Sequence, residues 1–418
     1  MIPRWARLEK FLNYALIFLL PTQLALHFWP PTAFVFGVRV DYLAPSIYLT
    51  DVLFLTVFVF WIKYHNDKLF GFIKKNKVFL FLFLFIVILN TAFSTSFGPS
   101  IYKWIKFTEL GLFYFYVRAR GDIFNSRTLY ATIFYSLIFF SVIGISQFVL
   151  GKTLGGPLYL LGERSFRIST PGIALTQILD RNFMRAYSTF SHPNSFAGYL
   201  GLGLLTLLFT YSKKELARRI WGILIICLAF VLTFSLSAFV GIVFCGILFI
   251  LLRKKTFNTK SLVLFLTIFT LISLAQPLVS NFVLNTIPDL PQSVSQRFDL
   301  SSVAGKMISD KFLLGEGLNT FVINEPRIKH FGNYLWTLQP VHNVSLLLFS
   351  ETGIIGLSFF YLVLIKLSKK ATGLKGAPFY LSLIFILTSG LFDHYWLTLQ
   401  QNMFFSVFIL ANSFRAEG

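Results

Sequence analysis

The stretch IWGILIICLAFVLTFSLSAFVGIVFCGILFILL, residues 220–252, runs for 33 residues without a charged side chain. One helix of that length would be about 50 Å long, whereas the hydrocarbon core of a bilayer is about 30 Å thick. Basic residues lie on both sides, at positions 218–219 and 253–255. Because basic residues gather on the cytoplasmic side of membrane proteins, both ends of the stretch should face that side. We therefore predict two short membrane helices that turn near residues 235–237.

The composition indicates that the whole chain is a membrane protein. Of its 418 residues, 56% are apolar and 13% are charged, and the mean hydropathy is +0.71. A soluble domain of this size needs roughly 25% charged residues to cover its surface. The two cysteines, Cys227 and Cys245, both lie inside apolar runs, which excludes a disulfide framework and a cysteine metal site.

Residues 377–414 form a second long apolar stretch, which we divide in the same way at a polar turn over residues 393–396 that includes Asp393 and His394. Residues 11–29 are interpreted as a first span instead of a signal peptide, because the run is long and lacks a small-residue cleavage pattern. The fold class is therefore all-α: a polytopic integral membrane helical bundle of about 12 transmembrane helices. It forms a single membrane domain over residues 1–418, in the cytoplasmic (inner) membrane, with both termini in the cytoplasm. The predicted single spans lie near residues 11–29, 47–62, 78–97, 101–117, 128–149, 192–210, 261–279 and 343–365.

The basic excess follows from this topology. The net charge is +20, and the segments predicted to face the cytoplasm hold 24 of the 37 Lys and Arg residues but only 5 of the 17 acidic residues. Nearly all of the positive excess therefore lies where membrane topology requires it. No nucleic-acid partner is needed to explain it.

Two long segments are predicted on the outer side. The first is residues 150–191, and the second is a large loop with short helices, residues 280–341, before the tenth helix. Between them lie the core helices of residues 192–279, with the helical hairpin of residues 220–252; the last helices occupy residues 343–414. Neither loop is large enough for a nucleotide-sugar domain, and the sequence has no Asp-x-Asp pair and no Gly-rich phosphate loop. Chemistry is therefore expected at the outer face of the bundle.

Arg185 stands just before a predicted span, on the side where basic residues are usually scarce. It can bind an anion at the level of the lipid headgroups, or simply contact those headgroups. Downstream, Ser191-His192-Pro193-Asn194 resembles a helix start, in which Ser or Asn caps the helix and Pro fits its first turn. His192 is interpreted as structural.

His342 lies at the outer boundary, between a Pro turn and the helix that follows Asn343. Nearby cations would lower its pKa and keep it a free base, able to take a proton from a sugar hydroxyl; the alternative is a capping or interface histidine. Glu351, nine residues further on, is costly at membrane depth and is expected to pair with an Arg or to orient His342. Gly353 and Gly356 are expected to allow close helix packing.

The stretch His342-Asn343, nine residues, Gly353, two residues, Gly356 resembles the signature of the O-antigen ligase and Wzy-type O-antigen polymerase superfamily. The motifs Phe190-Ser-His-Pro-Asn194-Ser-Phe-Ala-Gly198 and Leu314-Gly-Glu-Gly317-Leu are also similar to motifs of that family. The order and spacing of the three motifs cover roughly residues 185–360, and the topology fits over the whole chain.

The resemblance implies a membrane glycosyltransferase of cell envelope polysaccharide or lipopolysaccharide biosynthesis. Its donor would be a glycan on undecaprenyl diphosphate and its acceptor a sugar hydroxyl of a glycan or glycolipid, with no metal and no cofactor. The family's loop histidine corresponds to His342, and its two diphosphate-binding arginines correspond to Arg185 and Arg297. Asn343, Glu351, His192 and Asn194 would support them. Many relatives carry Ser-Arg-Gly where this chain has Ser235-Leu-Ser237, so no role of that arginine can be assigned here.

A transporter is the alternative, such as a flippase for polyprenyl-linked glycans. A flippase needs a cavity that reaches both sides and usually charged residues at midplane in both halves. The polar groups of this chain gather instead in two outer loops, which favours the transferase. The acceptor distinguishes a ligase from a polymerase, so the sequence leaves both open, together with the sugar, the linkage and the oligomeric state.

Overall fold

The computed structural model describes residues 4–251, 258–287, 292–330, 338–369, 371 and 376–413, and they fold mainly into helices. The α-helices are α1 (Arg4–Phe18), α2 (Leu49–Ala92), α3 (Phe97–Ala119), α4 (Gly121–Phe124), α5 (Arg127–Leu150), α6 (Pro193–Thr210), α7 (Lys213–Arg218), α8 (Ile220–Leu232), α9 (Leu236–Leu251), α10 (Thr259–Thr286), α11 (Gln292–Asp310), α12 (Phe321–Ile328), α14 (Val344–Ser368), α15 (Ala377–Gly390), α16 (Tyr395–Thr398) and α17 (Gln400–Asn412). Three antiparallel pairs of strands accompany them, β1 (Ala25–His27) with β4 (Ser46–Tyr48), β2 (Phe34–Val35) with β3 (Val38–Arg39), and β5 (Leu175–Ile178) with β6 (Arg181–Met184). Short 3-10 helices are η1 (Pro31–Ala33), η2 (Asp41–Leu43) and η3 (Gly156–Leu161).

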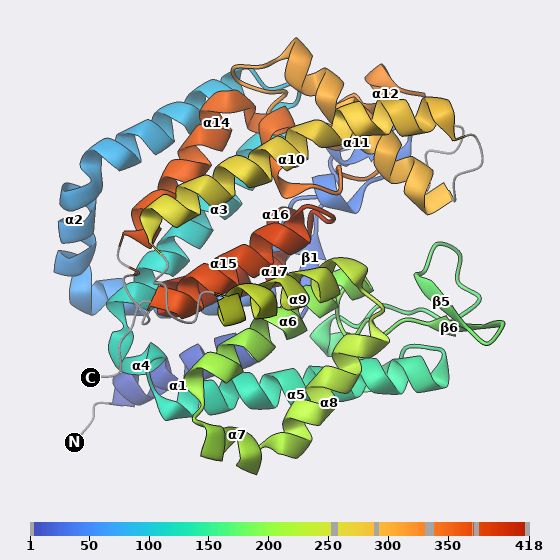
Figure 1. The fold of residues 1–418 in the computed structure, drawn as a ribbon. Helices are drawn as coiled ribbons and strands as arrows, with labels where there is room; N and C mark the ends of the chain where they lie inside the picture. Colours follow the sequence, from blue (N-terminus) through green and yellow to red (C-terminus); the bar gives the residue numbers. More distant parts are fainter. Residues whose placement is uncertain are drawn as a thin grey trace.

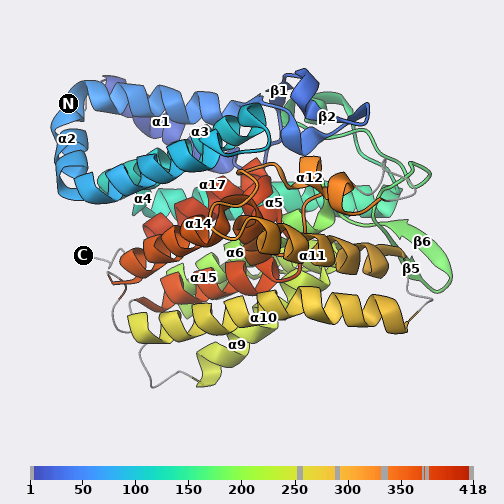
Figure 2. The same ribbon diagram turned by 90° about the horizontal axis from the view of Figure 1, so that it is seen from above.

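The long helices run lengthwise and give the bundle two different ends (Figure 1). At one end, called the loop end, lie the strands, α12 and the segments that precede α6 and α14 (Figures 1 and 2). At the other, called the terminal end, α1 begins, α17 ends and α4 lies. The two segments predicted as outer loops therefore lie at the same end of the molecule.

The exterior of the bundle is apolar. Among the described residues, α5, α10 and α14 are long and apolar enough to cross a membrane, and α8, α9 and α15 are shorter apolar helices. Large apolar side chains such as Val149, Leu278 and Phe282 are at least 70% exposed. In water such a surface would be strongly unfavourable, whereas lipid tails accommodate it. The helical membrane fold agrees with the prediction, and the number of about 12 spans stays a prediction.

The centre of the bundle is formed by α6, α15 and α17 (Figure 1). Every residue of α15 from Phe379 to Gly390 is buried, and α17 is buried along nearly its whole length. The polar turn between them, residues 391–394, therefore lies at the centre of the loop end.

The first predicted span, residues 11–29, is wrong in its bounds. Helix α1 already begins at Arg4 and ends at Phe18, three residues before Pro21. Proline lacks an amide hydrogen and disfavours helical backbone in the residue before it, so the helix ends there in spite of the apolar run that follows. The remainder of the run leads into β1, which pairs with β4 at the loop end.

The spans predicted at residues 47–62 and 78–97 belong to one 44-residue helix, α2, which has non-helical backbone at His65 and Asn76. Between these two kinks the chain stays helical across the terminal end, where a loop was expected (Figure 2). This segment is amphipathic, because Lys68 and its basic neighbours are exposed while Phe72 packs on Phe115 with ring centroids 4.4 Å apart.

Both long apolar stretches consist of two helices. Residues 220–252 contain α8 and α9, separated at residues 233–235, and residues 377–414 contain α15 and α17, with the short α16 at the predicted turn. The basic residues at positions 253–255, 375 and 415, which supported the two divisions, lie outside the described residues.

Candidate active site

Four titratable side chains from separate parts of the chain come together at the loop end. His192 directly precedes α6, His342 lies two residues before α14, and Asp393 and His394 form the turn between α15 and α16. The ring centroids of His342 and His394 are 5.1 Å apart. The charge of Asp393 acts on all three histidines. We call these four residues the histidine cluster.

Asn194 connects Arg185 to this cluster. Arg185 Nη2 donates a hydrogen bond to Asn194 Oδ1 at 2.6 Å, and Asn194 Nδ2 donates one to Asp393 Oδ2 at 2.7 Å. Arg185 Nε also donates to the carbonyl of Thr233, in the turn between α8 and α9, at 2.5 Å. Burial lowers the pKa of Arg185 to about 10, which leaves the guanidinium protonated at neutral pH. The result is a fixed positive charge beside the histidine cluster.

The histidines of the cluster are neutral at physiological pH. Burial lowers the pKa of His342 to about 3, with His394 and Arg297 lowering it further, and burial lowers the pKa of His192 to about 4. His192 is nevertheless exposed as a residue, so water reaches this part of the cluster. The buried His342 Nδ1 has no hydrogen-bond partner within the described residues. In the tautomer protonated on Nε2, this nitrogen can accept a proton from an alcohol.

Asp393 supplies the negative charge of the cluster. Burial raises the pKa of this carboxyl, but His394, His342 and His192 together with the hydrogen bond from Asn194 outweigh burial, and the net pKa is lowered. Its second oxygen, Oδ1, accepts the backbone N–H of His394 at 2.8 Å. An ionised carboxylate at this place would stabilise an imidazolium formed at His342.

Arg297, on α11, is placed within electrostatic reach of the cluster. Its charge lowers the pKa of Arg185, His192, His342 and His394. The side chain is exposed, and among the described residues it makes no hydrogen bond or ion pair. Two arginines thus stand near the same histidines, one fixed by hydrogen bonds and one directed to solvent.

Two polar residues fix the helix starts that carry the histidines. His192 itself caps α6, since its Nδ1 accepts the N–H of Asn194 at 3.1 Å, where Ser191 or Asn194 was expected to be the cap. Asn343 is buried and caps α14, because its Oδ1 accepts the N–H of Leu346 at 3.0 Å. The Asn343 amide also donates to Ser273 and Gln276 on α10. These bonds hold the backbone next to His342 in place.

Glu351 does not contact His342 or an arginine within the described residues, contrary to expectation. Its Oε1 accepts the backbone N–H of Phe321 at 3.0 Å, at the first residue of α12. Its charged neighbour is Lys103 on α3, which also acts on His394. Both side chains line a small cavity together with Thr398, and Thr398 Oγ1 hydrogen-bonds His394 Nδ1 at 2.8 Å. Glu351 therefore anchors the second long segment. The buried Lys103 lies within electrostatic reach of His394.

Helix α14 is interrupted at Gly353, where the backbone has φ +64° and ψ −173°. The turn formed by residues 312–317 lies against this interruption and satisfies its backbone. Ile354 N–H donates to the Phe312 carbonyl at 2.9 Å, and Gly317 N–H donates to the Glu351 carbonyl at 2.9 Å. A Cβ on Gly353 would lie 2.2 Å from Leu313 O, and one on Gly315 would lie 2.4 Å from the Glu351 carbonyl carbon. Two of the sequence motifs therefore meet here, and Gly353 permits contact with a turn instead of the helix packing that was expected.

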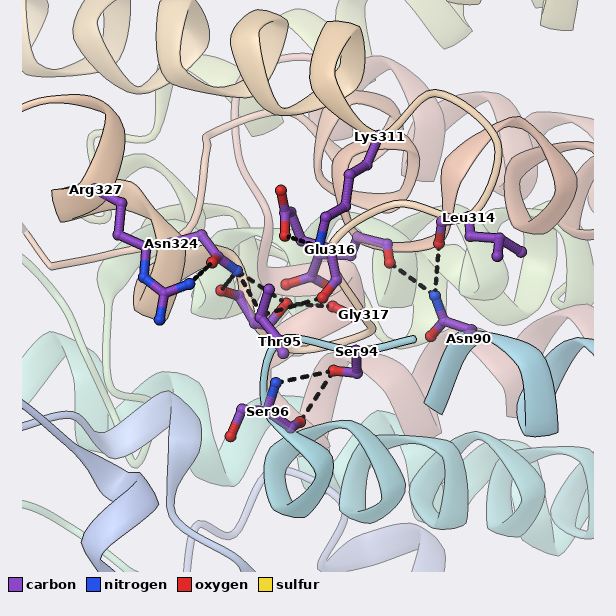
Figure 3. Close-up of polar contacts among 12 residues, drawn as sticks. Asn90, Ser94, Thr95, Ser96, Lys311, Leu314, Glu316, Gly317, Asn324 and Arg327 are labelled. Carbon is purple, nitrogen blue, oxygen red and sulfur yellow. Dashed lines mark hydrogen bonds and ion pairs between the residues drawn. The ribbon is translucent and has the colours of Figure 1, made fainter. Parts of the chain in front are cut away.

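The end of α2 and the turn that follows it also bind residues 314–316 and the Glu351 carbonyl, next to the interruption at Gly353 (Figure 3). The Asn90 amide donates to the carbonyls of Leu314 and Glu351 at 2.8 and 2.9 Å, and the N–H and hydroxyl of Thr95 both donate to the Glu316 carbonyl. Asn324 on α12 donates to the Thr95 hydroxyl at 2.8 Å. The second long segment is thereby attached to the membrane helices at several points.

Lys106 pairs with Glu109 at 2.8 Å and with Asp51 at 2.5 Å. Lys106 thus pairs with one acidic residue on α2 and one on α3, which explains these buried groups without a substrate. Arg164 likewise pairs with Asp41 at 2.9 Å. No three His, Cys, Asp or Glu side chains of the described residues are arranged to hold a metal ion.

The sequence did not assign a role to Asp393, His394 or Lys103. Asp393 and His394 were described only as part of a polar turn. The signal that could have marked them as functional is that no other charged residue or histidine occurs in residues 377–414. Lys103 gave no signal apart from the general cost of a lysine in an apolar helix.

One comparison with known proteins gave a match. Residues 221–361 match the family model described as O-antigen ligase. The match covers the α8–α9 hairpin, α11, the turn at residues 312–317, His342 and the interruption at Gly353. No curated protein matches the chain. Over residues 221–361 the chain is therefore similar to the O-antigen ligase family, as the sequence motifs indicated.

Proposed function

We propose that this chain transfers a glycan from undecaprenyl diphosphate to a sugar hydroxyl at the outer face of the cytoplasmic membrane. The family match and the apolar helices indicate a membrane protein of the glycan ligase or polymerase kind. The observation that carries the finer proposal is the connection from Arg185 through Asn194 to Asp393, beside a neutral His342. It brings an anion-binding group and a base together at one end of the bundle.

In this proposal His342 is the base for the acceptor. Its unpartnered nitrogen takes the proton as the acceptor oxygen attacks the anomeric carbon of the donor sugar. The bond from that carbon to the diphosphate oxygen breaks, and inversion results at the carbon. Asp393 stabilises the imidazolium, as a buried carboxylate does beside a histidine base. No metal is required in this scheme.

Arg185 and Arg297 bind the diphosphate. A diphosphate is a good leaving group, so charge stabilisation suffices where a strong acid would otherwise be needed. Arg185 is held by two hydrogen bonds of 2.5 and 2.6 Å and is thus oriented before substrate arrives, which is the arrangement that stabilises developing charge most effectively. Arg297 is exposed and can close on the donor from α11.

The test is glycan transfer from a purified undecaprenyl-diphosphate oligosaccharide in detergent, with candidate acceptors and EDTA present. Released undecaprenyl diphosphate is measured for wild type and His342→Ala at equal folded amounts. We expect release by wild type and a loss of at least 100-fold in the variant, the low end of what a positioned base contributes. His330→Ala is the matched control, since His330 is an exposed histidine on the same side.

Equal release by wild type and His342→Ala would remove His342 from the mechanism while keeping the transferase. If no acceptor supports release and the reconstituted protein instead moves the lipid-linked glycan across vesicles, the transferase proposal fails and the flippase replaces it. Supplying a glycolipid core or a growing repeat as the acceptor separates a ligase from a polymerase.

A further inference from the structure

A second cavity lies at the terminal end, at the opposite end of the bundle from the histidine cluster. It has a volume of about 220 Å³ and lies between the starts of α5 and α15, the ends of α6 and α17, and α7. It is larger than the roughly 150 Å³ cavity that accommodates a benzene molecule. Its lining is polar and apolar in nearly equal parts, and the polar residues include Arg127, Thr210, Glu215, Ser382 and Asn412.

Asn412 is one of the lining residues with a buried polar atom that has no hydrogen-bond partner among the described residues. Asn412 is only 7% exposed, and its amide donates to the Tyr130 hydroxyl at 3.1 Å. Its Oδ1 is buried and accepts no hydrogen bond from the described residues. Because an unpartnered buried oxygen is unfavourable by roughly 1–3 kcal/mol, this oxygen calls for a donor such as a hydroxyl.

The rim of the cavity is positively charged. Arg127 is exposed. The guanidinium carbon of Arg219 lies 4.4 Å from the ring centroid of Tyr211, which is another lining residue. The single carboxylate of the lining, Glu215, accepts hydrogen bonds from the N–H and hydroxyl of Ser212, both at 2.9 Å, and so caps α7. Both arginines influence Glu215 electrostatically, so positive charge is in excess at the mouth.

Exposed apolar side chains lie on α6, which lines the cavity, and on α8, which packs on α6. Leu208 on α6 is 55% exposed and Trp221 on α8 is 78% exposed, and α8 packs on both α5 and α6. An acyl chain can lie on these side chains while a polar head enters the cavity. Basic pockets between membrane helices bind the heads of anionic lipids in this way.

We propose that this cavity binds the head group of an anionic phospholipid with a hydroxylated head, such as phosphatidylglycerol, from the leaflet at the terminal end. Arg127 and Arg219 contact the phosphodiester, and the Asn412 oxygen accepts a head-group hydroxyl. This site is separate from the transferase chemistry and does not depend on it.

The test is native mass spectrometry of the delipidated full-length protein with phosphatidylglycerol or phosphatidylcholine carrying the same acyl chains. We expect wild type to retain phosphatidylglycerol several-fold more strongly than phosphatidylcholine. Arg127→Gln should weaken phosphatidylglycerol binding about fivefold, the contribution of one basic residue near an anionic lipid surface. Asn412→Leu should weaken it about as much while leaving the charge unchanged.

Lys68→Gln is the matched control, because Lys68 is an exposed lysine of the terminal end that does not line the cavity. It should leave phosphatidylglycerol binding unchanged. Equal binding of the two lipids to wild type, or unchanged phosphatidylglycerol binding in Arg127→Gln, would overturn the proposal. Competition by sn-glycerol 1-phosphate as effective as that by the intact lipid would also overturn it, since the site would then bind a soluble phosphoester.

Discussion

Gly353→Ala tests whether the interruption of α14 is built around the absence of a side chain. The residue combines φ +64° with ψ −173°, a region of backbone space that is essentially restricted to glycine. Holding alanine there costs about 1–3 kcal/mol. The new Cβ would also lie 2.2 Å from Leu313 O and 2.5 Å from Leu314 N, and both atoms belong to the backbone and cannot rotate away.

The turn must therefore move by about 1 Å to restore normal van der Waals contact. Such a movement stretches the hydrogen bonds from Ile354 N–H and from Gly317 N–H, each 2.9 Å long and worth about 1 kcal/mol. Together with the backbone strain, the free energy of unfolding should fall by about 3–5 kcal/mol. For a chain of this size we expect a melting temperature lower by roughly 5 °C.

The assay is thermal unfolding of the purified protein in detergent, followed by tryptophan fluorescence. Gly111→Ala on α3 is the control, because a Cβ there would meet no atom within 4 Å and alanine favours helix. Gly353→Ala melting at the same temperature as Gly111→Ala, with transfer activity unchanged, would refute the reasoning.

Four further outcomes are expected. Asn194→Leu removes both hydrogen bonds that join Arg185 to Asp393. With about 1.5–3 kcal/mol for each bond to a charged group, kcat/KM should fall at least tenfold and the melting temperature by a few degrees, and unaltered kinetics at equal folded amounts would contradict the connection. Because the pKa of His342 lies near 3 in the folded chain, the base stays unprotonated down to low pH; kcat/KM should therefore be flat from pH 8 to pH 5, whereas a tenfold decline per pH unit below 6.5 would indicate an ordinary histidine. The same lowered pKa means that the unfolded chain binds protons below about pH 6.5 while the folded site does not, so stability should decrease as the pH falls from 6.5 towards 3, and a melting temperature constant over that range would argue against a buried neutral His342. Lys103→Gln keeps a polar group in the small cavity but removes its charge beside His394 and Glu351. The rate of transfer should fall while the KM for the donor changes little. A rise in the KM for the donor alone would instead make Lys103 a donor-binding group.

The membrane character and the two helical hairpins could be predicted because charge and hydropathy act locally along the chain. Residues 220–252 are too long for one span and are bounded by basic residues, and these two facts suffice to divide them. The end of α1 and the helix across the kinks of α2 were predicted wrongly. In both places a long apolar or basic run concealed the local determinant, which is Pro21 in the first case and the amphipathic pattern around Phe72 in the second.

For the candidate site, the sequence indicated single residues but not their neighbours. His342 and Arg185 could be singled out as candidates because each stands just before a predicted span. That Asp393 lies beside His342 depends on how α14 and α15 pack, and nothing along the chain encodes a distance between two turns 50 residues apart. The contact of Gly353 with residues 312–317 escaped for the same reason, since a glycine in an apolar run is equally compatible with helix packing and with an interruption.

Asn90 has a consequence for how mutational data on this chain would be understood. Besides its two donated hydrogen bonds, its Oδ1 accepts from Leu318 N–H and from the indole of Trp104, both at 2.9 Å. A side-chain amide has two donor hydrogens and two acceptor lone pairs, so this one is saturated. Aspartate would lose both donors, leucine would lose everything, and glutamine is one methylene too long. A saturation screen for polysaccharide production should therefore score position 90 as intolerant as position 342, although Asn90 contributes no chemistry. Intolerance in such a screen marks the residues that hold the second long segment in place as well as the residues that react. Only a measurement of the amount of folded protein beside activity separates the two groups.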